Sequence, residues 1–283
     1  MIAPPPLPAP VLDPIVRLAL AEDLGRAGDL TTDATISPDT HIKAEIRARK
    51  AGTLAGMDVA AHALKCIDPA VALEQAMQDA DPISPGDLIA TLTGEARSIL
   101  MAERTMLNFI GRLSGIATLT ASFVEKVAHT DATIVCTRKT TPGHRALEKR
   151  AVRCGGGTSH RYGLDDAILI KDNHIAACGS VSDALKRAHA YAGHLRMIEV
   201  EVDTLAQLQE ALQHKPHAVL LDNMDNETLR AAVTMIDGAC KAEASGGVNL
   251  DTVSGIAETG VDYISVGALT HSASNLDVGL DLP

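Results

Sequence analysis

Residues 197–222 read MIEVEVDTLAQLQEALQHKPHAVLLD and contain one complete structural repeat. Short apolar runs occupy 197–202 and 217–222, and apolar residues at helical spacing fill 204–213 between them. A buried-type strand, a helix and a second buried-type strand, in this order, predict a parallel strand–helix–strand unit.

The same alternation continues on both sides of this stretch. Further apolar runs lie at 132–136, 167–170, 241–245 and 262–267, and further helical patterns lie at 181–191, 226–236 and 250–258. Polar residues follow all six strand ends. We therefore predict a β/α barrel, because a doubly wound sheet, the alternative, concentrates its ligands mainly at one switch point.

The N-terminal part of the chain has a different pattern. Residues 42–50 (IKAEIRARK) alternate apolar and charged side chains, which predicts a half-exposed antiparallel strand. Helices are expected at 13–24 and 58–67, weaker strands at 71–78 and 88–93, and a loop at GDLTTD, residues 28–33. These elements predict a small α+β domain.

A long helical pattern at 96–112 continues at 116–128, after Gly115, and marks the predicted change of domain. We place the boundary near residue 112, which gives an N-terminal domain at 1–112, with a Pro-rich arm at 1–10, and a catalytic domain at 113–283.

Composition excludes several classes of function. The 283 residues are 46% hydrophobic but only 2% aromatic, so the platforms that stack single-stranded nucleic acid are missing. Asp and Glu number 36 against 25 Lys and Arg, and such an acidic chain repels nucleic acid. The five cysteines lack metal-ligand spacing, the first ten residues are no signal peptide, and no apolar run reaches membrane-spanning length. We expect a reduced, cytoplasmic protein without a membrane or nucleic-acid partner.

One window, residues 137–174, reverses the acidic balance of the chain. Its cationic and histidine side chains are Arg138, Lys139, His144, Arg145, Lys149, Arg150, Arg153, His160, Arg161, Lys171 and His174. Cations gathered on an acidic protein repel one another unless an anion lies among them. A small polyanion, such as a phosphate or a carboxylate metabolite, is therefore the predicted ligand.

Three positions in this window carry most of the chemistry. Arg138 and Lys139 follow a buried-type strand, and they bind a carboxylate or phosphate unless the loop is simply solvated. Lys171 ends the next strand, where an unpaired ammonium is costly. It is an anion ligand, a Schiff-base nucleophile or a structural partner of an acid.

The glycine run 155–157 precedes His160 and Arg161. Its backbone amides can face an anion, although a plain loop is equally consistent with the sequence. His160 and Arg161 directly after the run favour an anion-binding loop. His160 can equally be a hydrogen-bonded structural histidine.

Acids and glycines close the later strands. Glu199 and Glu201 face the same way on one strand and Asp222 ends the next, so two carboxylates can hold Mg²⁺ or balance the basic window. The stretches 245–247 (Ser-Gly-Gly) and 265–267 (Ser-Val-Gly) end the last two strands, where barrels commonly bind phosphate through backbone amides.

Many of these stretches, in order, resemble the quinolinate phosphoribosyltransferase family. The motifs are LALAEDLGRAGDLTTDATI, AERTMLNFIGRLSGIATLT, TRKTTPGHRALEKRAV, GGGTSHRYGL, DDAILIKDNHI, IEVEV, LLDNM, EASGGV and ISVGALTHSA. The resemblance covers nearly the whole chain except the Pro-rich arm. A related group linked to molybdenum transport is disfavoured, because the ERT and KDNH motifs are intact here.

The resemblance implies an α/β protein with an N-terminal α/β sandwich domain and an incomplete β/α barrel of the type II phosphoribosyltransferase kind, with its C-terminal tail packed on the N-terminal domain. It implies a homodimer in which Arg104 is lent to the partner's site. The implied quinolinate ligands are Arg104, Thr137, Arg138, His160, Arg161 and Lys171. The implied phosphoribosyl pyrophosphate ligands are Lys139, Glu201, Asp222, Ser245, Gly246, Gly247, Ser265, Val266 and Gly267, with Glu201 and Asp222 holding Mg²⁺ directly or through water. Arg145, Lys149, Arg150 and Arg153 receive no ligand.

The implied reaction joins quinolinate and phosphoribosyl pyrophosphate into nicotinate mononucleotide, pyrophosphate and CO₂, a step of de novo NAD biosynthesis. Two other functions stay open on the residues alone. One is a Schiff-base lyase or aldolase built on Lys171, and the other is a non-catalytic sensor of a phosphorylated metabolite.

Overall fold

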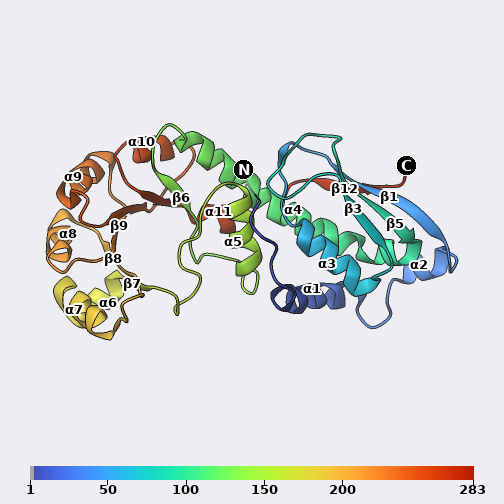
Figure 1. Cartoon of the computed structure of the whole chain (residues 1–283), viewed down its shortest axis with the longest axis horizontal. Coiled ribbons are helices and arrows are strands. Elements are labelled where there is room, and N and C mark those ends of the chain that lie inside the picture. The colour runs from blue at the N-terminus through green and yellow to red at the C-terminus, as the bar shows by residue number, and fades with distance from the viewer. Residues whose placement is uncertain (1–2) are drawn as a thin grey trace. The chain divides into compact units, whose positions relative to one another are not determined.

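The computed structural model describes residues 3–283, which form two compact units (Figure 1). Unit 1 comprises the chain up to Ala121, together with Thr140–Gly156 and Thr270–Pro283. Unit 2 comprises Ser122–Lys139 and Gly157–Leu269. The division therefore differs from the single predicted boundary near residue 112, because the chain returns to unit 1 twice.

Unit 1 contains an antiparallel sheet, two short paired strands and surrounding helices. Its elements are α1 (Ala9–Leu24), α2 (Leu30–Thr35), β1 (His41–Ala48), β2 (Gly52–Thr53), α3 (Met57–Ile67), β3 (Ala72–Gln75), β4 (Pro82–Ile83), β5 (Leu88–Glu95), the larger part of α4 (Ala96–Val127), α5 (Arg145–Cys154), the end of α11 (Ala268–His271) and β12 (Val278–Asp281). The four-stranded sheet has the order β12-β1-β5-β3, and the final strand of the chain pairs with β1 (Figure 1).

Helix α4 is continuous through the predicted boundary. Its glycines pack closely instead of breaking the helix: a Cβ on Gly115 would lie 2.0 Å from the Ser274 carbonyl oxygen, and one on Gly111 would lie 2.8 Å from that of Leu276. The C-terminal tail thus crosses α4 where only glycine fits. The helix is long and apolar enough to span a membrane, but 61% of its most apolar window is buried in the protein, as is usual for a core helix.

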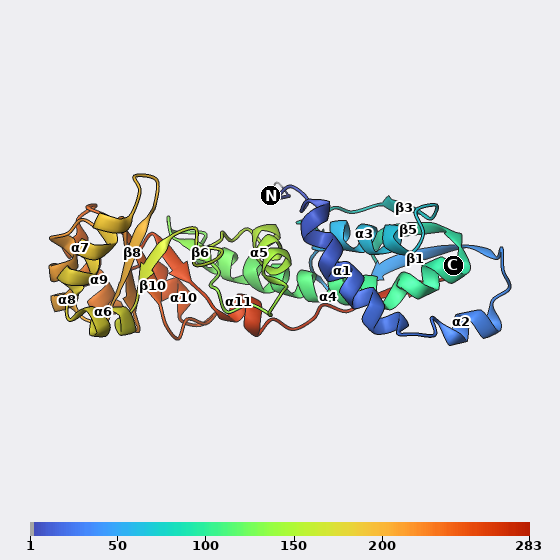
Figure 2. The ribbon, with the colours of Figure 1, turned by 90° about the horizontal axis from the view of Figure 1, so that it is seen from below.

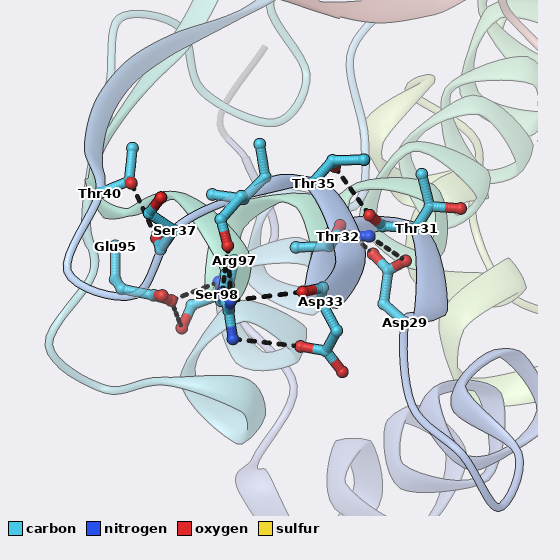
Figure 3. A network of polar contacts seen from close by, with 11 residues as sticks. Asp29, Thr31, Thr32, Asp33, Thr35, Ser37, Thr40, Glu95, Arg97 and Ser98 are labelled. Carbon is cyan, nitrogen blue, oxygen red and sulfur yellow. Dashed lines mark hydrogen bonds and ion pairs between the residues drawn. The ribbon is translucent and has the colours of Figure 1, made fainter.

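The predicted loop at residues 28–33 is wrong, because residues 30–33 of this stretch form most of helix α2. The Asp29 carboxylate caps the helix by accepting a hydrogen bond from the Thr32 amide at 3.0 Å. Arg97, in the first turn of α4, donates from Nε to the Ile36 carbonyl at 2.9 Å, just beyond the end of α2 (Figure 3). A helix of six residues is only marginally stable alone. The contact with Arg97 stabilises α2, and this contact cannot be read from the sequence of the helix itself.

Helix α5 places the four unassigned cations of the basic window in unit 1. Arg150 is buried, and its guanidinium contacts Asp79 at 2.5 Å and Asp58 at 3.3 Å. It also donates to the carbonyl oxygens of Pro4 and Pro5 in the N-terminal arm, at 3.2 and 3.1 Å. Arg150 therefore has a structural role, since its partners are all protein groups of unit 1.

Glu148, in the first turn of α5, is fully buried and contacts two further segments. It accepts hydrogen bonds from the Thr141 amide and hydroxyl at 3.0 and 2.8 Å and from Arg112 at 2.9 Å. Arg112 also donates to the Ala273 carbonyl in the tail, at 2.8 Å. This network closes the core of unit 1 around α4 and α5.

Unit 2 is a six-stranded parallel sheet with helices along its outer face (Figures 1 and 2). Its elements are β6 (Thr133–Val135), β7 (Ile168–Ile170), α6 (Asp172–Cys178), α7 (Val181–Tyr191), β8 (Ile198–Val202), α8 (Leu205–Leu212), β9 (Ala218–Asp222), α9 (Asn226–Ile236), β10 (Lys241–Ser245), α10 (Val253–Ala257) and β11 (Tyr263–Ser265). The strand order is β6-β11-β10-β9-β8-β7, and β6 and β7 are the two edges. An α/β fold with an antiparallel-sheet domain and an open, barrel-like parallel-sheet domain is confirmed.

We expect Arg150→Ala to lower the free energy of unfolding by about 3 kcal/mol, because the change leaves Asp79 buried without its counter-ion. Urea or thermal unfolding, followed by circular dichroism, measures the loss. The control is Arg17→Ala, since Arg17 forms an ion pair with Asp13 in which the two side chains are 63% and 39% exposed. That change should cost less than about 1 kcal/mol. Equal losses in the two variants would contradict the structural role of Arg150.

Candidate active site

The carboxyl ends of all six parallel strands of unit 2 meet at one edge of the sheet, because every pairing is parallel. The residues that end or follow these strands include almost every predicted ligand. They are Thr137, Arg138 and Lys139 after β6, Lys171 after β7, Glu201 near the end of β8, Asp222 at the end of β9, Ser245, Gly246 and Gly247 from β10, and Ser265, Val266 and Gly267 from β11. We call this set, together with His160, which contacts Glu199 of β8, and Arg161, which lies near Arg138, the strand-end site.

Lys171 and Glu201 form the shortest ion pair of the strand-end site. The Lys171 ammonium lies 2.5 Å from Glu201 Oε2, and the two side chains are 47% and 9% exposed. The backbone amide of Lys171 donates to Nδ1 of His174 at 2.9 Å, which fixes the turn from β7 into α6. The pair neutralises a buried carboxylate while keeping a partly exposed cation at the sheet edge.

Arg138 and Arg161 are the cations that the protein leaves least satisfied. Within residues 3–283, the buried Nε atom of each guanidinium has no hydrogen-bond partner. Burial lowers the pKa of Arg161, and the positive charge of Arg138 lowers it further. Two half-buried arginines that repel each other have a free-energy cost, which an anion bound between them would offset.

His160 is held by protein groups at both ring nitrogens. The backbone amide of Arg161 donates to Nδ1 at 2.8 Å, and Nε2 lies 2.9 Å from Glu199 Oε2. Since Nδ1 accepts a hydrogen bond, the ring proton lies on Nε2, which donates to Glu199. These contacts are those of a hydrogen-bonded structural histidine. For His160 to bond a ligand directly, Glu199 or the Arg161 amide would have to give up its bond to the ring.

Glu243 lies behind His160 and was not identified from the sequence. Its Oε1 is 3.6 Å from His160 Nε2, and within the described residues 3–283 this oxygen and Oε1 of Glu199 have no hydrogen-bond partner. Burial and the neighbouring Glu199 carboxylate raise the pKa of Glu243 to about 7. The only signal in the sequence was an acid between two alanines in the buried-type run KAEAS.

The glycine loop after β10 has a backbone conformation that lets a ligand approach its amides closely. Gly246 and Gly247 have φ values of +92° and +62°, so their amides follow a path that other residues rarely adopt. A Cβ on Gly246 would lie 2.1 Å from Asn223 Oδ1, whereas one on Gly247 would meet no atom within 4 Å. Successive amides in such a turn form a concave anion-binding surface.

Two carboxylates of the strand-end site suit a hard divalent cation. Glu201 lies level with Leu220 in the sheet register, so Asp222 stands two residues nearer the carboxyl end of the neighbouring strand. Their oxygen atoms are the donors that Mg²⁺ prefers, and Mg²⁺ is usually held by one or two carboxylates together with substrate phosphates. Glu201 would share its carboxylate between Lys171 and the ion, so these residues fit the predicted metal.

The predicted ligand Arg104 belongs to unit 1, whereas the strand-end site belongs to unit 2. It lies on α4 in unit 1, its side chain is 65% exposed, and its nearest acid is Glu103 at 3.9 Å. Such an exposed guanidinium remains accessible to a ligand. Arg145, Lys149, Arg150 and Arg153 are likewise in unit 1, on α5.

Comparisons with known proteins agree with this arrangement. The model of the quinolinate phosphoribosyl transferase N-terminal domain matches residues 29–114, and that of the C-terminal domain matches residues 116–281. A nicotinate-nucleotide pyrophosphorylase (carboxylating) of Mycobacterium leprae is 45% identical, covering 94% of this chain and 95% of that protein. A probable nicotinate-nucleotide pyrophosphorylase (carboxylating) of Bacillus subtilis is 44% identical, covering 92% of this chain and 90% of that protein.

Solved structures of this family have the same fold as this chain. NadC from Streptococcus pyogenes superposes with a TM-score of 0.95 at 40% identity, covering 99% of this chain and all of that one. The nicotinate-nucleotide pyrophosphorylase of Francisella tularensis superposes with a TM-score of 0.92 at 38% identity, covering 98% of both chains. The fold and the strand-end site thus define a phosphoribosyltransferase. The chain belongs to the quinolinate phosphoribosyltransferase family, which confirms the resemblance seen in its motifs.

We expect Gly246→Ala to destabilise the protein by about 1–3 kcal/mol, because the new Cβ combines a strained φ with a clash against Asn223. Gly247→Ala is the matched control, since it introduces the same methyl group at a positive φ in open space. Thermal unfolding of both variants measures the difference. If Gly247→Ala costs as much as Gly246→Ala, then backbone strain, and not the contact with Asn223, determines the loop.

Proposed function

We propose that this protein transfers the phosphoribosyl group of phosphoribosyl pyrophosphate to the ring nitrogen of quinolinate and releases CO₂. The products are nicotinate mononucleotide and pyrophosphate, so the enzyme is a decarboxylating pentosyltransferase of NAD biosynthesis. Family membership over residues 29–281 supports the reaction. The observation that carries it is that the buried Nε atoms of Arg138 and Arg161, at the strand-end site, have no hydrogen-bond partner among residues 3–283, because a dicarboxylate supplies the missing acceptors.

Quinolinate binding is assigned to the cations that surround these atoms. Arg138 and Arg161 hold the carboxylates, Thr137 and Lys171 contribute from the neighbouring strand ends, and His160 acts with Arg161. Arg104 supplies a further cation from a second subunit. Guanidinium groups suit this task because their planar fork matches a carboxylate in two-point contact.

The phosphoribosyl pyrophosphate side is assigned to the remaining strand ends. Lys139 binds phosphate as a point charge, and the amides and hydroxyls of Ser245–Gly247 and Ser265–Gly267 hold the 5′-phosphate. Glu201 and Asp222 would hold Mg²⁺, which when bound neutralises pyrophosphate oxygens and makes this group a better leaving group.

The chemistry needs positioning and electrostatics more than it needs a nucleophilic side chain. Held quinolinate directs its nitrogen lone pair at C1 of the ribose, and the bond from C1 to pyrophosphate breaks as the bond to nitrogen forms. The ring nitrogen then bears a positive charge. The carboxylate beside it leaves as CO₂, its bonding electrons stay on the ring carbon, and this carbon takes up a proton. Arg138 and Arg161 orient the ring throughout.

Lys171 does not favour the Schiff-base alternative. Its side-chain nitrogen lies 2.5 Å from Glu201 Oε2, and this contact would have to break before the nitrogen could attack a carbonyl carbon. A lyase or aldolase would form a lysine adduct with a carbonyl substrate that borohydride traps.

The working form is proposed to be a cytoplasmic homodimer. A second subunit gives a role to the exposed Arg104, whose guanidinium lies 3.9 Å from Glu103 on its own helix. Isologous dimers create two equivalent sites, so each subunit would lend its Arg104 and receive one in return.

The reaction is tested by incubating the protein with quinolinate, phosphoribosyl pyrophosphate and Mg²⁺. CO₂ and pyrophosphate should appear together in equal amounts, and neither should form when one substrate is omitted. A sensor of a phosphorylated metabolite would bind ligand without releasing either product. Absence of both products would refute the proposed reaction.

Arg138→Ala should raise the KM for quinolinate by about tenfold to a hundredfold, the usual effect of losing a charge-assisted contact. Lys171→Ala should act in the same direction. Glu201→Ala combined with Asp222→Ala should instead reduce turnover and weaken the use of phosphoribosyl pyrophosphate. Steady-state kinetics with each substrate varied in turn separates these effects. Arg230→Ala, at an exposed arginine of α9, is the control and should match the wild type. Near-normal turnover in the Glu201/Asp222 double variant would disprove the metal assignment.

Mixing two inactive variants tests the shared site directly. Arg104→Ala and Lys171→Ala subunits, unfolded and refolded together, should regain roughly a quarter of wild-type activity, since half of the dimers are mixed and each mixed dimer has one intact site. Each variant refolded alone is the control. If the mixture is no more active than its components, Arg104 acts within its own subunit or not at all.

A further inference from the structure

We propose that Glu243 is a positioning residue of the quinolinate site, which acts as a neutral carboxylic acid behind His160 and allows His160 to hold the backbone of Arg161. The proposal rests on the proposed function, since it concerns how one of the assigned quinolinate ligands is placed. Glu243 itself need not touch either substrate.

The geometry around His160 defines a chain of contacts from the sheet interior to Arg161. Glu199 on β8 accepts the Nε2 proton of His160 at 2.9 Å, and Nδ1 of the same ring accepts the amide proton of Arg161 at 2.8 Å. The ring therefore connects β8 to the loop that carries Arg161. Both bonds need the tautomer with its proton on Nε2.

Glu243 decides whether this arrangement is stable. Its carboxyl Oε1 lies 3.6 Å from the same Nε2, and the side chain is 7% exposed. The imidazole N–H has a single proton, which Glu199 already accepts. A second carboxylate anion at this distance would therefore find no imidazole proton to accept, and it would lie buried beside the first carboxylate and repel it.

A proton on Glu243 removes this conflict. Burial first, and then the charge of Glu199, raise the pKa of Glu243 to about 7, while His160 and the hydroxyl of Ser265 act in the opposite direction. The flanking strands place Leu220 of β9 and Tyr263 of β11 beside Glu243 in the sheet register. Glu199 and His160 are thus the charged groups that act on it.

The sign of the pH dependence follows directly. A carboxyl group whose pKa is raised above its ordinary value stays neutral at pH values below the raised pKa and ionises as the pH rises through about 7. Ionised Glu243 would compete with Glu199 for the single Nε2 proton of His160 and would repel the Glu199 carboxylate, so the contact that holds the ring against the Arg161 amide would weaken. The quinolinate site should therefore loosen on the alkaline side.

The proposal is tested with Glu243→Gln, which copies the neutral acid in shape and cannot ionise, and with Glu243→Ala. In the wild type, the KM for quinolinate should rise as the pH passes from about 6 to about 8, whereas the KM for phosphoribosyl pyrophosphate should not follow it. Glu243→Gln should keep the low KM for quinolinate across this range, and Glu243→Ala should raise it about tenfold at all of these pH values. Glu227→Gln, at an exposed acid of α9, is the matched control and should keep the wild-type profile.

The same alkaline rise in Glu243→Gln and in the wild type would overturn the proposal, as would an unchanged KM in Glu243→Ala. A second measurement is independent of catalysis and of the alanine variant's folding: the nitrogen chemical shifts of His160 should show the Nε2–H tautomer near pH 6.5. A protonated Nδ1 at that pH would also overturn it. A wild-type protein that makes no CO₂ or pyrophosphate would instead refute the proposed function itself.

Discussion

Charge compensation at the carboxyl edge of the unit 2 sheet is the constraint on which the candidate site depends. An acidic chain gathers Arg138, Arg161 and Lys171 at this edge, and burial together with the charge of Arg138 disfavours the charged form of Arg161 and lowers its pKa. Glu201 neutralises Lys171 at 2.5 Å. In the part of the chain that the structure describes, the Nε atoms of Arg138 and Arg161 have no hydrogen-bond partner. The protein thus compensates one of these positive charges itself and leaves positive charge without an acceptor at Arg138 and Arg161, where an anionic substrate would supply one.

Two histidines shape this edge through backbone hydrogen bonds. The amides of Arg161 and Lys171 donate to Nδ1 of His160 and His174, respectively. In each case a ring nitrogen fixes the backbone of the neighbouring cation, so the side chain of that cation starts from a defined position. This arrangement links the histidines of the basic window to preorganisation, the feature on which catalysis without a nucleophile depends.

The other half of the basic window serves the stability of unit 1. Arg150 joins Asp58, Asp79 and the N-terminal arm, and Glu148 joins Arg112 to the segment that begins with Thr141. Arg150, Asp79 and Glu148 are buried, and each has a protein partner of opposite charge. Cations that are close in sequence therefore have opposite roles: Arg150 on α5 is compensated by protein carboxylates, whereas Arg138 and Arg161 are partly left for a ligand.

The sequence alone determined the alternation of strands and helices in unit 2, the alternating strand β1, and the strand-end residues, because hydrophobic periodicity and strand ends are local features. It also determined the family through motifs spread along the chain. Local pattern failed at α2, where Arg97 bonds the carbonyl just beyond the end of the helix. The close packing of the tail against Gly111 and Gly115 of α4 is likewise visible only in the folded chain. Only the tertiary structure decided that Arg150 is structural, that His160 is bonded on both sides, and that Glu243 lies behind it. Those roles depend on distances between residues far apart in the chain, and burial changes the chemistry of a charged group only after the chain has folded around it.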